Sequence, residues 1–419
     1  MLLNDPQKAM LNGECGEAVR LAMSILVDVG RLYDAPDMIP VAMVHDDSIF
    51  HVGRAQIDFA EHLVTLGGRF VVPTSSNAGN VDQQRWLEQR FTKATAEENL
   101  RLIKAHLKLG VAPTFTCAPY QAGLIPRFGQ DVAWAESNAT VFANSVIGAR
   151  TNRYAGLLEL CVGLTGVAPN FGLHQPQNRR AEMLIDIKAL SAETLSDDAA
   201  WPLLGYAVGE LAEDRVVAID GAPSNISIDA LKSFGAAAAS SGAVALFHMI
   251  GVTPEAPEKA ACLHERKAPA HESISTDIIR QVECKLSSAP TAVDLILLGC
   301  PHFSYQEFLL LTHLLAGRRI HANVGMWVFT SRSIYQWLVI GGLLDVLQNA
   351  GIKIYTDGCV LTVPYHAWGV GTLMTTSAKM ANYFYSDAGI SICYNGLTDC
   401  VESAVSGCFV RERKPWDKL

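Results

Sequence analysis

The chain has 419 residues, of which 49% are hydrophobic and 18% charged, and its formal net charge at pH 7 is −9. The length indicates two or three domains, and the acidic balance without a dense basic patch argues against a nucleic-acid partner. Because no apolar run reaches the length of a membrane span and the N-terminus lacks a basic segment followed by an apolar one, we expect a cytoplasmic protein without a membrane partner.

Ten cysteines are scattered along the chain, and none forms a C-x-x-C pair. This distribution fits neither the disulfide framework of a secreted protein nor a zinc ribbon. It suits a reducing compartment, in which thiols stay free to bind metal.

The N-terminal part of the chain alternates helical and strand-like stretches. Helical periodicity predicts helices within residues 7–33 and over 55–66. Between them, the apolar stretch 38–44 predicts a strand that leads into the sequence His-Asp-Asp-Ser at 45–48. Polar side chains therefore follow the end of this strand.

A polar turn and a cysteine follow the next elements. The turn Pro-Thr-Ser-Ser-Asn-Ala-Gly-Asn at 73–80 offers hydroxyl, amide and backbone donors to a carboxylate or phosphate, or it only caps the next helix. An amphipathic helix over 96–109 precedes the strand-like run 110–116, which ends at Cys117.

Small and polar residues are mixed into the apolar stretch 134–145. Because buried polar groups cost free energy unless they are paired, this mixture suggests the lining of a cavity. Arg150 and Arg153 follow closely, and arginine is the side chain suited to bidentate binding of a carboxylate. We therefore expect substrate contacts in this region.

Strands and helices also alternate in the middle of the chain. Strands are expected over 182–189, 216–220 and 243–248, and a helix over 199–211. Such alternation is typical of an α/β fold with parallel strands.

Three further strands are expected at 293–299, 326–329 and 352–355, separated by helices over 305–316 and 333–350. If these strands are parallel, right-handed crossovers place their carboxyl ends on one rim of the sheet. Ligands of open α/β sheets bind at that rim.

Cysteines occupy equivalent places at these strand ends. Cys300 and Cys359 follow the first and third strands, Ser331 and Arg332 follow the second, and we expect all four to face one crevice. Cys117 has the same place earlier in the chain. A single free cysteine is usually a small buried hydrophobic residue, but three thiols at strand ends beside Gly and Pro favour a metal site.

Nine segments together point to a family. They are PTSSN at 73–77, TCAPY at 116–120, AWAES at 133–137, ANSVIGARTNR at 143–153, GVTPEA at 251–256, GCPH at 299–302, TSR at 330–332, DGC at 357–359 and SAK at 377–379. In these segments the chain resembles the large subunit or large domain of the aconitase X family, a dehydratase branch of the aconitase superfamily. The resemblance extends in family order over nearly the whole chain.

The resemblance implies repeated three-layer α/β/α domains with parallel-rich sheets, and residues 1–419 would form the large catalytic domain in two or three α/β subdomains. It also implies an iron–sulfur cluster, 2Fe-2S or 4Fe-4S, or an iron site, held by Cys117, Cys300 and Cys359. The substrate-contacting positions of the family fall on Ser48, Ile49, Asn77, Ala78, Ser137, Asn138 and Lys379.

The substrate implied by the resemblance is cis-3-hydroxy-L-proline. The polar cluster after the first strand is closer to bacterial relatives that dehydrate this amino acid than to archaeal phosphomevalonate dehydratases, whose reaction is the alternative. Loss of water gives an enamine that tautomerises to 1-pyrroline-2-carboxylate. Arg150, Arg153 or Lys379 would hold the substrate carboxylate, and Asn77 and Ser137 would orient the ring.

Family members also have a small swivelling domain, fused or separate, which is thought to supply a serine base. This sequence shows only the pattern of the large domain. We therefore expect a small partner subunit in a two-subunit enzyme, and we assign no catalytic base to this chain.

Two interpretations from other classes stay open. The first is an iron-sensing binding protein without dehydratase activity, although the acidic balance disfavours RNA as its target. The second is an α/β enzyme that uses Cys117 or Cys300 as a nucleophile, with His302 or His248 as the base.

Overall fold

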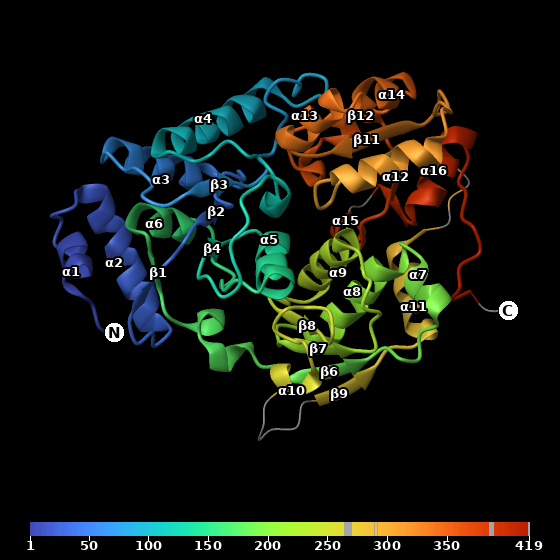
Figure 1. Ribbon diagram of the computed structural model, residues 1–419. Coiled ribbons are helices and arrows are strands. Elements are labelled where there is room, and N and C mark those ends of the chain that lie inside the picture. Colours follow the sequence, from blue (N-terminus) through green and yellow to red (C-terminus); the bar gives the residue numbers. More distant parts are fainter. Residues whose placement is uncertain (264–269, 289, 291, 385–388, 418–419) are drawn as a thin grey trace.

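The computed structural model describes residues 1–263, 270–288, 290, 292–384 and 389–417. Helices alternate with short strands that are mostly parallel (Figure 1), which confirms the expected α/β class. No helix in these described ranges combines the length and the apolar character that a membrane crossing needs.

The first part of the chain, coloured blue to green in Figure 1, contains one three-stranded parallel sheet. Its elements are α1 (Asp5–Leu11), α2 (Glu17–Leu32), β1 (Met38–Pro40), β2 (Val44–Asp46), α3 (Arg54–Thr65), β3 (Thr74–Ser76), α4 (Lys93–Leu109), β4 (Ala133–Trp134), α5 (Ser137–Phe142), a π-helical turn (Ala143–Ile147), α6 (Leu158–Thr165) and β5 (Val167–Pro169). The strand order is β3-β2-β4, and β1 pairs antiparallel with β5. Helix α3 packs on α4, and α2 packs on α6.

The second part contains a four-stranded parallel sheet in the order β8-β7-β6-β9. Its elements are β6 (Met183–Asp186), α7 (Ala192–Ser196), α8 (Ala200–Ala212), β7 (Val217–Asp220), α9 (Ile228–Ser241), β8 (Phe247–Met249), α10 (Lys259–Cys262), β9 (Ala270–Ser273) and α11 (Thr276–Leu286).

The third part contains a five-stranded parallel sheet in the order β12-β11-β10-β13-β14. Its elements are β10 (Leu295–Leu298), α12 (Tyr305–Leu315), β11 (Gly325–Phe329), α13 (Arg332–Ile340), α14 (Leu343–Asn349), β12 (Lys353–Tyr355), β13 (Thr372–Thr375), α15 (Ala378–Phe384), β14 (Ser391–Tyr394) and α16 (Leu397–Ser406). Strands β10, β11 and β12 are the three strands expected to be parallel, and they are.

Helices α8, α9, α11 and α15 form a layer that the second and third parts share (Figure 1). Buried side chains of both sheets and of these helices belong to one hydrophobic cluster, among them Ile185, Leu204, Phe234 and Leu297. Helices α8 and α9 are in close contact, since a Cβ on Gly205 would lie 2.2 Å from the backbone oxygen of Phe234. The two sheets therefore have a common core.

Two expected helices are each divided in the structure. The stretch 7–33 forms α1 and α2, which are separated at Gly16 with φ of 98°. The stretch 333–350 forms α13 and α14, and Gly342 between them has φ of 69°. Glycine adopts these positive φ angles without the steric cost that a Cβ brings, and each of the two glycines stands directly before the helix that follows it.

The strand-like run 110–116 is not a strand. Its pairing with the first sheet is a parallel bridge between Ala112 and Ser75, followed by a hydrogen bond of 3.1 Å from the N–H of Thr116 to the carbonyl oxygen of Ser76. The run still extends along the edge of the three-stranded sheet.

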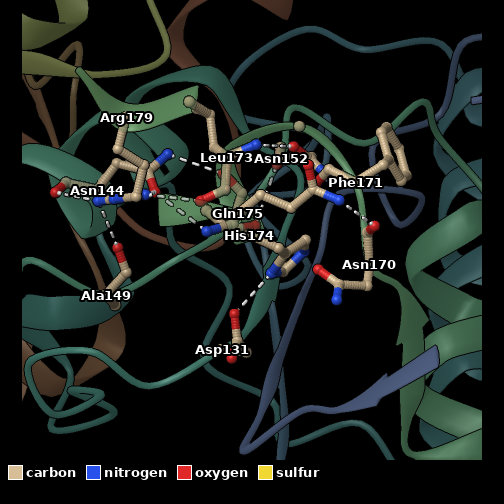
Figure 2. A network of polar contacts seen from close by, with 12 residues as sticks. Asp131, Asn144, Ala149, Asn152, Asn170, Phe171, Leu173, His174, Gln175 and Arg179 are labelled. Atoms are coloured by element: carbon tan, nitrogen blue, oxygen red, sulfur yellow. Dashed lines mark hydrogen bonds and ion pairs between the residues drawn. The ribbon is translucent and has the colours of Figure 1, made fainter. Parts of the chain in front are cut away.

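Arg179 joins the first and second parts of the chain and is 3% exposed. Its guanidinium group donates to both carboxylate oxygens of Glu255, at 3.0 and 2.9 Å. It also donates to Oδ1 of Asn144 and to the carbonyl oxygens of Leu173 and Ala149, each at 3.0 Å. Figure 2 shows Arg179 with Asn144, Ala149 and Leu173. With Glu255 included, this side chain connects three chain segments. A buried charge is stable only when it is paired and hydrogen-bonded, as it is here.

Replacing Arg179 tests this junction. Arg179→Ala leaves Glu255 and several carbonyl groups without their partner, so we expect a loss of about 3–5 kcal/mol in the free energy of unfolding. Urea unfolding followed by circular dichroism measures it. Arg69→Ala removes an exposed arginine and is expected to cost less than about 0.5 kcal/mol. Equal losses in the two variants would contradict the role given to Arg179.

Candidate active site

The candidate active site is a cavity of about 670 Å³ at the carboxyl ends of two parallel sheets. In the three-stranded sheet, Asp47 follows β2, Asn77 follows β3 and Glu136 follows β4. In the five-stranded sheet, Cys300 follows β10 and Cys359 follows β12. Parallel sheets bind their ligands at this edge, so polar groups from both sheets converge on one space.

A second cavity, of about 880 Å³, lies on the other side of the loop 299–301, which lines both cavities. Its buried lysine, Lys232, is already paired with Asp229 at 2.9 Å and with Glu307 at 2.5 Å. Of the described residues that line it, Cys300 is the sole cysteine. The smaller cavity therefore holds the chemistry that the sequence predicts.

All three predicted metal ligands, Cys117, Cys300 and Cys359, line the smaller cavity, and none is in a disulfide. The backbone N–H of His302 donates to Sγ of Cys117 at 3.3 Å, so the first and third parts of the chain meet here. Burial raises the pKa of each thiol, that of Cys359 to about 12. The thiols are therefore protonated at neutral pH unless a cation offsets their burial.

The imidazole of His302 connects the three cysteine loops. Its Nδ1 lies 3.0 Å from Oγ1 of Thr116, next to Cys117, and its Nε2 lies 3.2 Å from the carbonyl oxygen of Gly358, next to Cys359. Because a carbonyl only accepts, Nε2 carries the hydrogen and Nδ1 accepts from the threonine hydroxyl. Burial lowers the pKa of His302 to about 4. With both nitrogens engaged, the ring is not placed to act as base for a cysteine nucleophile.

The donor set fits an iron–sulfur cluster. Such clusters take thiolate ligands, and three free thiols from separate loops open onto one cavity. Within the part of the chain that the structure describes, no three His, Cys, Asp or Glu side chains are arranged to hold a metal ion. The three cysteines therefore fit a cluster by the chemistry of their thiols and by their position around one cavity.

A buried ion pair crosses the cavity wall. Nζ of Lys379 donates to Oε1 of Glu136 at 2.7 Å and to Oγ of Ser137 at 3.0 Å, and both charged side chains are 9% exposed. Burial alone would raise the pKa of Glu136, but the charge of Lys379 and hydrogen bonds from Lys379 and from the N–H of Ala139 outweigh it and lower this pKa. Glu136 is therefore a carboxylate at neutral pH.

Asp47 is in a different environment. Nδ2 of Asn77 donates to Oδ1 of Asp47, which holds the carboxyl group against the turn after β3. Burial, with the negative charges of Glu136 and Asp46, raises the pKa of Asp47 to about 7 against the opposing effects of Asn77 and Lys379. This carboxyl group exchanges its proton near neutral pH.

Five of the predicted substrate contacts line the cavity: Asn77, Ala78, Ser137, Arg153 and Lys379. The other four do not line it: Ser48, Ile49, Asn138 and Arg150. The hydroxyl of Ser48 donates to the buried carboxyl group of Glu159, whose pKa is raised by burial to about 8. Asn138 donates to the carbonyl oxygen of Cys117 at 2.9 Å. These side chains support the wall from behind.

Ser331 and Arg332 do not line the cavity either, although they follow β11. The hydroxyl of Ser331 caps α13 by accepting the N–H of Ile334 at 3.2 Å. Arg332 makes two hydrogen bonds of 2.6 Å with Asp357. Their role is to fix the loop that carries Cys359.

Several cavity residues were not singled out in the sequence: Asp47, Phe50, Glu136, Tyr154 and Tyr383. A signal existed for the two acidic residues, because Asp47 belongs to the polar cluster at a strand end and Glu136 is a lone charge in an apolar stretch. The aromatic residues gave no signal, since their spacing does not distinguish a cavity wall from a core.

The chain is a dehydratase, that is, a hydro-lyase, as are the relatives that match it over nearly its whole length. The chain matches the sequence models of the first, second and third domains of aconitase X over residues 1–177, 181–283 and 293–406. It belongs to the aconitase X family, as its sequence indicates.

Its relatives are dehydratases. The chain is 43% identical to cis-3-hydroxy-L-proline dehydratase of Pseudomonas aeruginosa, over 96% of this chain and 69% of that protein. It is 36% identical to the phosphomevalonate dehydratase large subunit of Methanothermobacter thermautotrophicus, over 94% of this chain and 96% of that protein. The crystal structure of Thermococcus kodakaraensis aconitase X in its holo-form matches with a TM-score of 0.86 and 29% identity, over 96% of this chain and 100% of that chain.

The ion pair between Glu136 and Lys379 leads to a stability prediction. Lys379→Met leaves a buried carboxylate without its cation, so we expect a loss of about 3–5 kcal/mol in the free energy of unfolding at pH 7. The double variant Glu136→Gln/Lys379→Met should recover most of it. Urea unfolding at pH 8 and at pH 5 measures both.

The pH dependence has a definite sign. The folded-state pKa of Glu136 lies below its ordinary value of about 4.3, so the wild-type pair stabilises above that pH and is lost as the pH falls through the folded value. In Lys379→Met the pKa of Glu136 rises, and its protonation relieves the penalty. The difference from wild type should therefore shrink as the pH falls. A double variant as unstable as Lys379→Met would contradict this account.

Proposed function

We propose that this chain is the large subunit of a two-subunit dehydratase that converts cis-3-hydroxy-L-proline to 1-pyrroline-2-carboxylate. The observation that carries the proposal is one cavity in which three free thiols come together with an arginine that has no ion pair among the described residues. The 43% identity to a dehydratase of this amino acid, against 36% to a phosphomevalonate dehydratase subunit, supports the choice of substrate.

In this proposal Cys117, Cys300 and Cys359 hold an iron–sulfur cluster or iron. When bound, that group supplies a Lewis acid that makes the substrate hydroxyl a better leaving group. The protein around it excludes water and positions the substrate. Buried loops on both sides, fixed by His302, give the three thiols a common orientation toward the cavity.

Arg153 is the proposed partner of the substrate carboxylate. It lines the cavity, donates from Nη1 to the carbonyl oxygen of Ala243 at 2.8 Å, and has no carboxylate partner among the described residues. Lys379 is neutralised by Glu136, and Arg150 does not reach the cavity. Arginine binds a carboxylate through two parallel hydrogen bonds, which fixes the orientation of the ring as well as its position.

The rest of the cavity suits a small ring. Phe50 and Tyr383 contribute aromatic surface, and Asn77 and Ser137 contribute polar groups. Phosphomevalonate carries a phosphate in addition to its carboxylate, and Arg153 is a single cation without an ion pair here. This charge count favours the amino acid over the phosphorylated substrate.

The proposed partner is a small swivelling subunit that covers the cavity and supplies the base. Relatives of nearly the same length as this chain are named large subunits, whereas the Pseudomonas enzyme is longer than the part that this chain matches. Elimination requires a base on carbon 2 of the ring in addition to help for the leaving group.

Arg153 and Arg150 form a matched pair for testing carboxylate binding. With the small subunit present, Arg153→Met should raise KM for cis-3-hydroxy-L-proline roughly 10- to 100-fold, because a hydrogen-bonded charge pair contributes about 1.5–3 kcal/mol. Arg150→Met should change KM less than about threefold. Steady-state kinetics with detection of the imine product measures both. A larger effect at Arg150 than at Arg153 would contradict the assignment.

The metal assignment is tested by changing each thiol separately. Protein purified without oxygen should contain iron and absorb visible light, and Cys117→Ser, Cys300→Ser and Cys359→Ser should each lose most of both. Cys161→Ser changes a buried cysteine that does not line the cavity and should keep them. Iron and sulfide analysis gives the composition. Turnover of phosphomevalonate but not of hydroxyproline by the complex would overturn the proposed substrate.

A further inference from the structure

We infer that Asp47 is the acid of this reaction, the group that gives its proton to the departing hydroxyl group. The inference depends on the proposed function, since it names a catalytic residue for that dehydration. It assigns to this chain one of the two proton transfers that the elimination requires, and it leaves the removal of the carbon-bound proton to a separate base.

The position of Asp47 is suited to this role. It lies directly after β2, at the edge of the sheet where the cavity opens, and it lines that cavity together with the three thiols. Asn77 donates an N–H to Oδ1 of Asp47. The carbonyl oxygen of a neutral carboxyl group is a better acceptor than its hydroxyl oxygen, so the N–H of Asn77 favours Oδ1 as the carbonyl oxygen and places the proton of a neutral Asp47 on Oδ2. The hydrogen bond therefore orients the carboxyl group and leaves one oxygen to carry the proton.

Glu136, His302 and Tyr154, three other titratable groups of the cavity, are engaged in contacts of their own. Glu136 is held as a carboxylate by Lys379, and both ring nitrogens of His302 are hydrogen-bonded. The hydroxyl of Tyr154 contacts Nε2 of His174 at 2.5 Å and therefore points away from the cavity. Among the described residues that line the cavity, Asp47 is the carboxyl group without a contacting cation.

The surroundings of Asp47 keep a proton on it. Asp46 and Glu136 repel a negative charge at this position, and they are opposed by Lys379 and by the hydrogen bond from Asn77. Arg153 also faces the cavity, and its charge is taken up by the substrate carboxylate in the proposed complex. Burial and these charges raise the pKa of Asp47 to about 7. An acid catalyst is most effective when its pKa is close to the working pH.

The stereochemistry of the substrate requires two separate groups. In cis-3-hydroxy-L-proline the hydroxyl and the carboxylate share one face of the ring, so the hydrogen on carbon 2 is on the opposite face. The base removes that hydrogen as a proton, the C–H electron pair forms the C2–C3 double bond, and the C3–O bond breaks. The departing oxygen takes the proton of Asp47 and leaves as water. The enamine then loses its N–H proton and gains one at carbon 3, and Asp47 regains a proton from solvent.

A substrate with a different leaving group separates acid catalysis from other roles. Fluoride leaves without a proton, so cis-3-fluoro-L-proline needs the base and the binding contacts but no acid. In the complex with the small subunit, Asp47→Asn should lower turnover of hydroxyproline by roughly 10²- to 10⁴-fold. It should lower fluoride release from the fluoro compound by less than about tenfold. The ratio of the two rates is the measurement.

Asp46→Asn is the matched control. Asp46 is buried beside Asp47, bonds to His106 and does not line the cavity. Because Asp46 is only one of the charges that keep the proton on Asp47, its change to asparagine should alter the ratio of the two rates far less than Asp47→Asn does, and the difference should vanish at pH values low enough to keep Asp47 protonated. Equal losses with both substrates in Asp47→Asn, or hydroxyproline turnover within threefold of wild type, would overturn the inference.

Infrared difference spectroscopy gives a readout that needs no turnover. Glu159 is a second buried carboxyl group near Asp47, and burial raises its pKa to about 8. The test is therefore the difference between the spectra of the wild-type complex and of Asp47→Asn, both without substrate. This difference should contain the C=O band of one protonated carboxyl group that disappears as the pH rises through about 7. A carboxylate at Asp47 throughout pH 5–8 would overturn the inference. If the wild-type complex does not dehydrate hydroxyproline at all, the proposed function fails, while the infrared result still reports on the proton of Asp47.

Discussion

The neutral imidazole of His302 is the contact on which the site depends. Its two nitrogens have opposite roles, one accepting from Thr116 and one donating to Gly358. The backbone N–H of His302 donates to Sγ of Cys117. The low pKa that burial gives this ring keeps both roles fixed at neutral pH. Two backbone hydrogen bonds stabilise the same junction. The N–H of Gly79 donates to the carbonyl oxygen of Asp357, and the N–H of Cys359 donates to the carbonyl oxygen of Gly79. The hydrogen bonds of His302 thus connect the three loops that carry Cys117, Cys300 and Cys359.

The charges around two chemically similar groups, Glu136 and Asp47, give them different protonation states. Glu136 and Asp47 are both buried carboxyl groups at strand ends of the same sheet, but only Glu136 has a lysine in contact. One is therefore ionised and structural, and the other holds a proton near neutral pH. Enzymes commonly separate the roles of two acidic residues by their surroundings in this way. Because Lys379 is neutralised, Arg153 carries the free positive charge of the cavity.

The sequence predicted the parallel strands β10, β11 and β12 and the placement of Cys300 and Cys359 at their ends, because short apolar runs followed by Gly and Pro are local signals. It did not predict the breaks at Gly16 and Gly342. Apolar residues continue across Gly342, whereas the polar run 12–17 around Gly16 was a local signal that the helical periodicity on either side outweighed.

The orientation of individual side chains was outside the reach of the sequence. Ser48 and Asp47 are neighbours in one polar cluster, yet Asp47 lines the cavity and Ser48 turns to Glu159, a residue more than a hundred positions later. Likewise, the sequence did not distinguish Arg150 from Arg153 as the ligand of the substrate carboxylate. In the structure Arg153 lines the cavity and Arg150 does not. Such choices depend on tertiary contacts that no local pattern contains.

The distribution of the three thiols along the chain sets an order of events during synthesis. His302 lies 185 residues after the cysteine that it contacts, with the whole second part of the chain between them. A ribosome that has released the first two parts has exposed Cys117 and Thr116. His302, Gly358 and the other two thiols have not yet been made, so neither hydrogen bond of the imidazole can form. The cavity is therefore among the last features to form, and anything that is to occupy it must arrive after translation has passed Lys379.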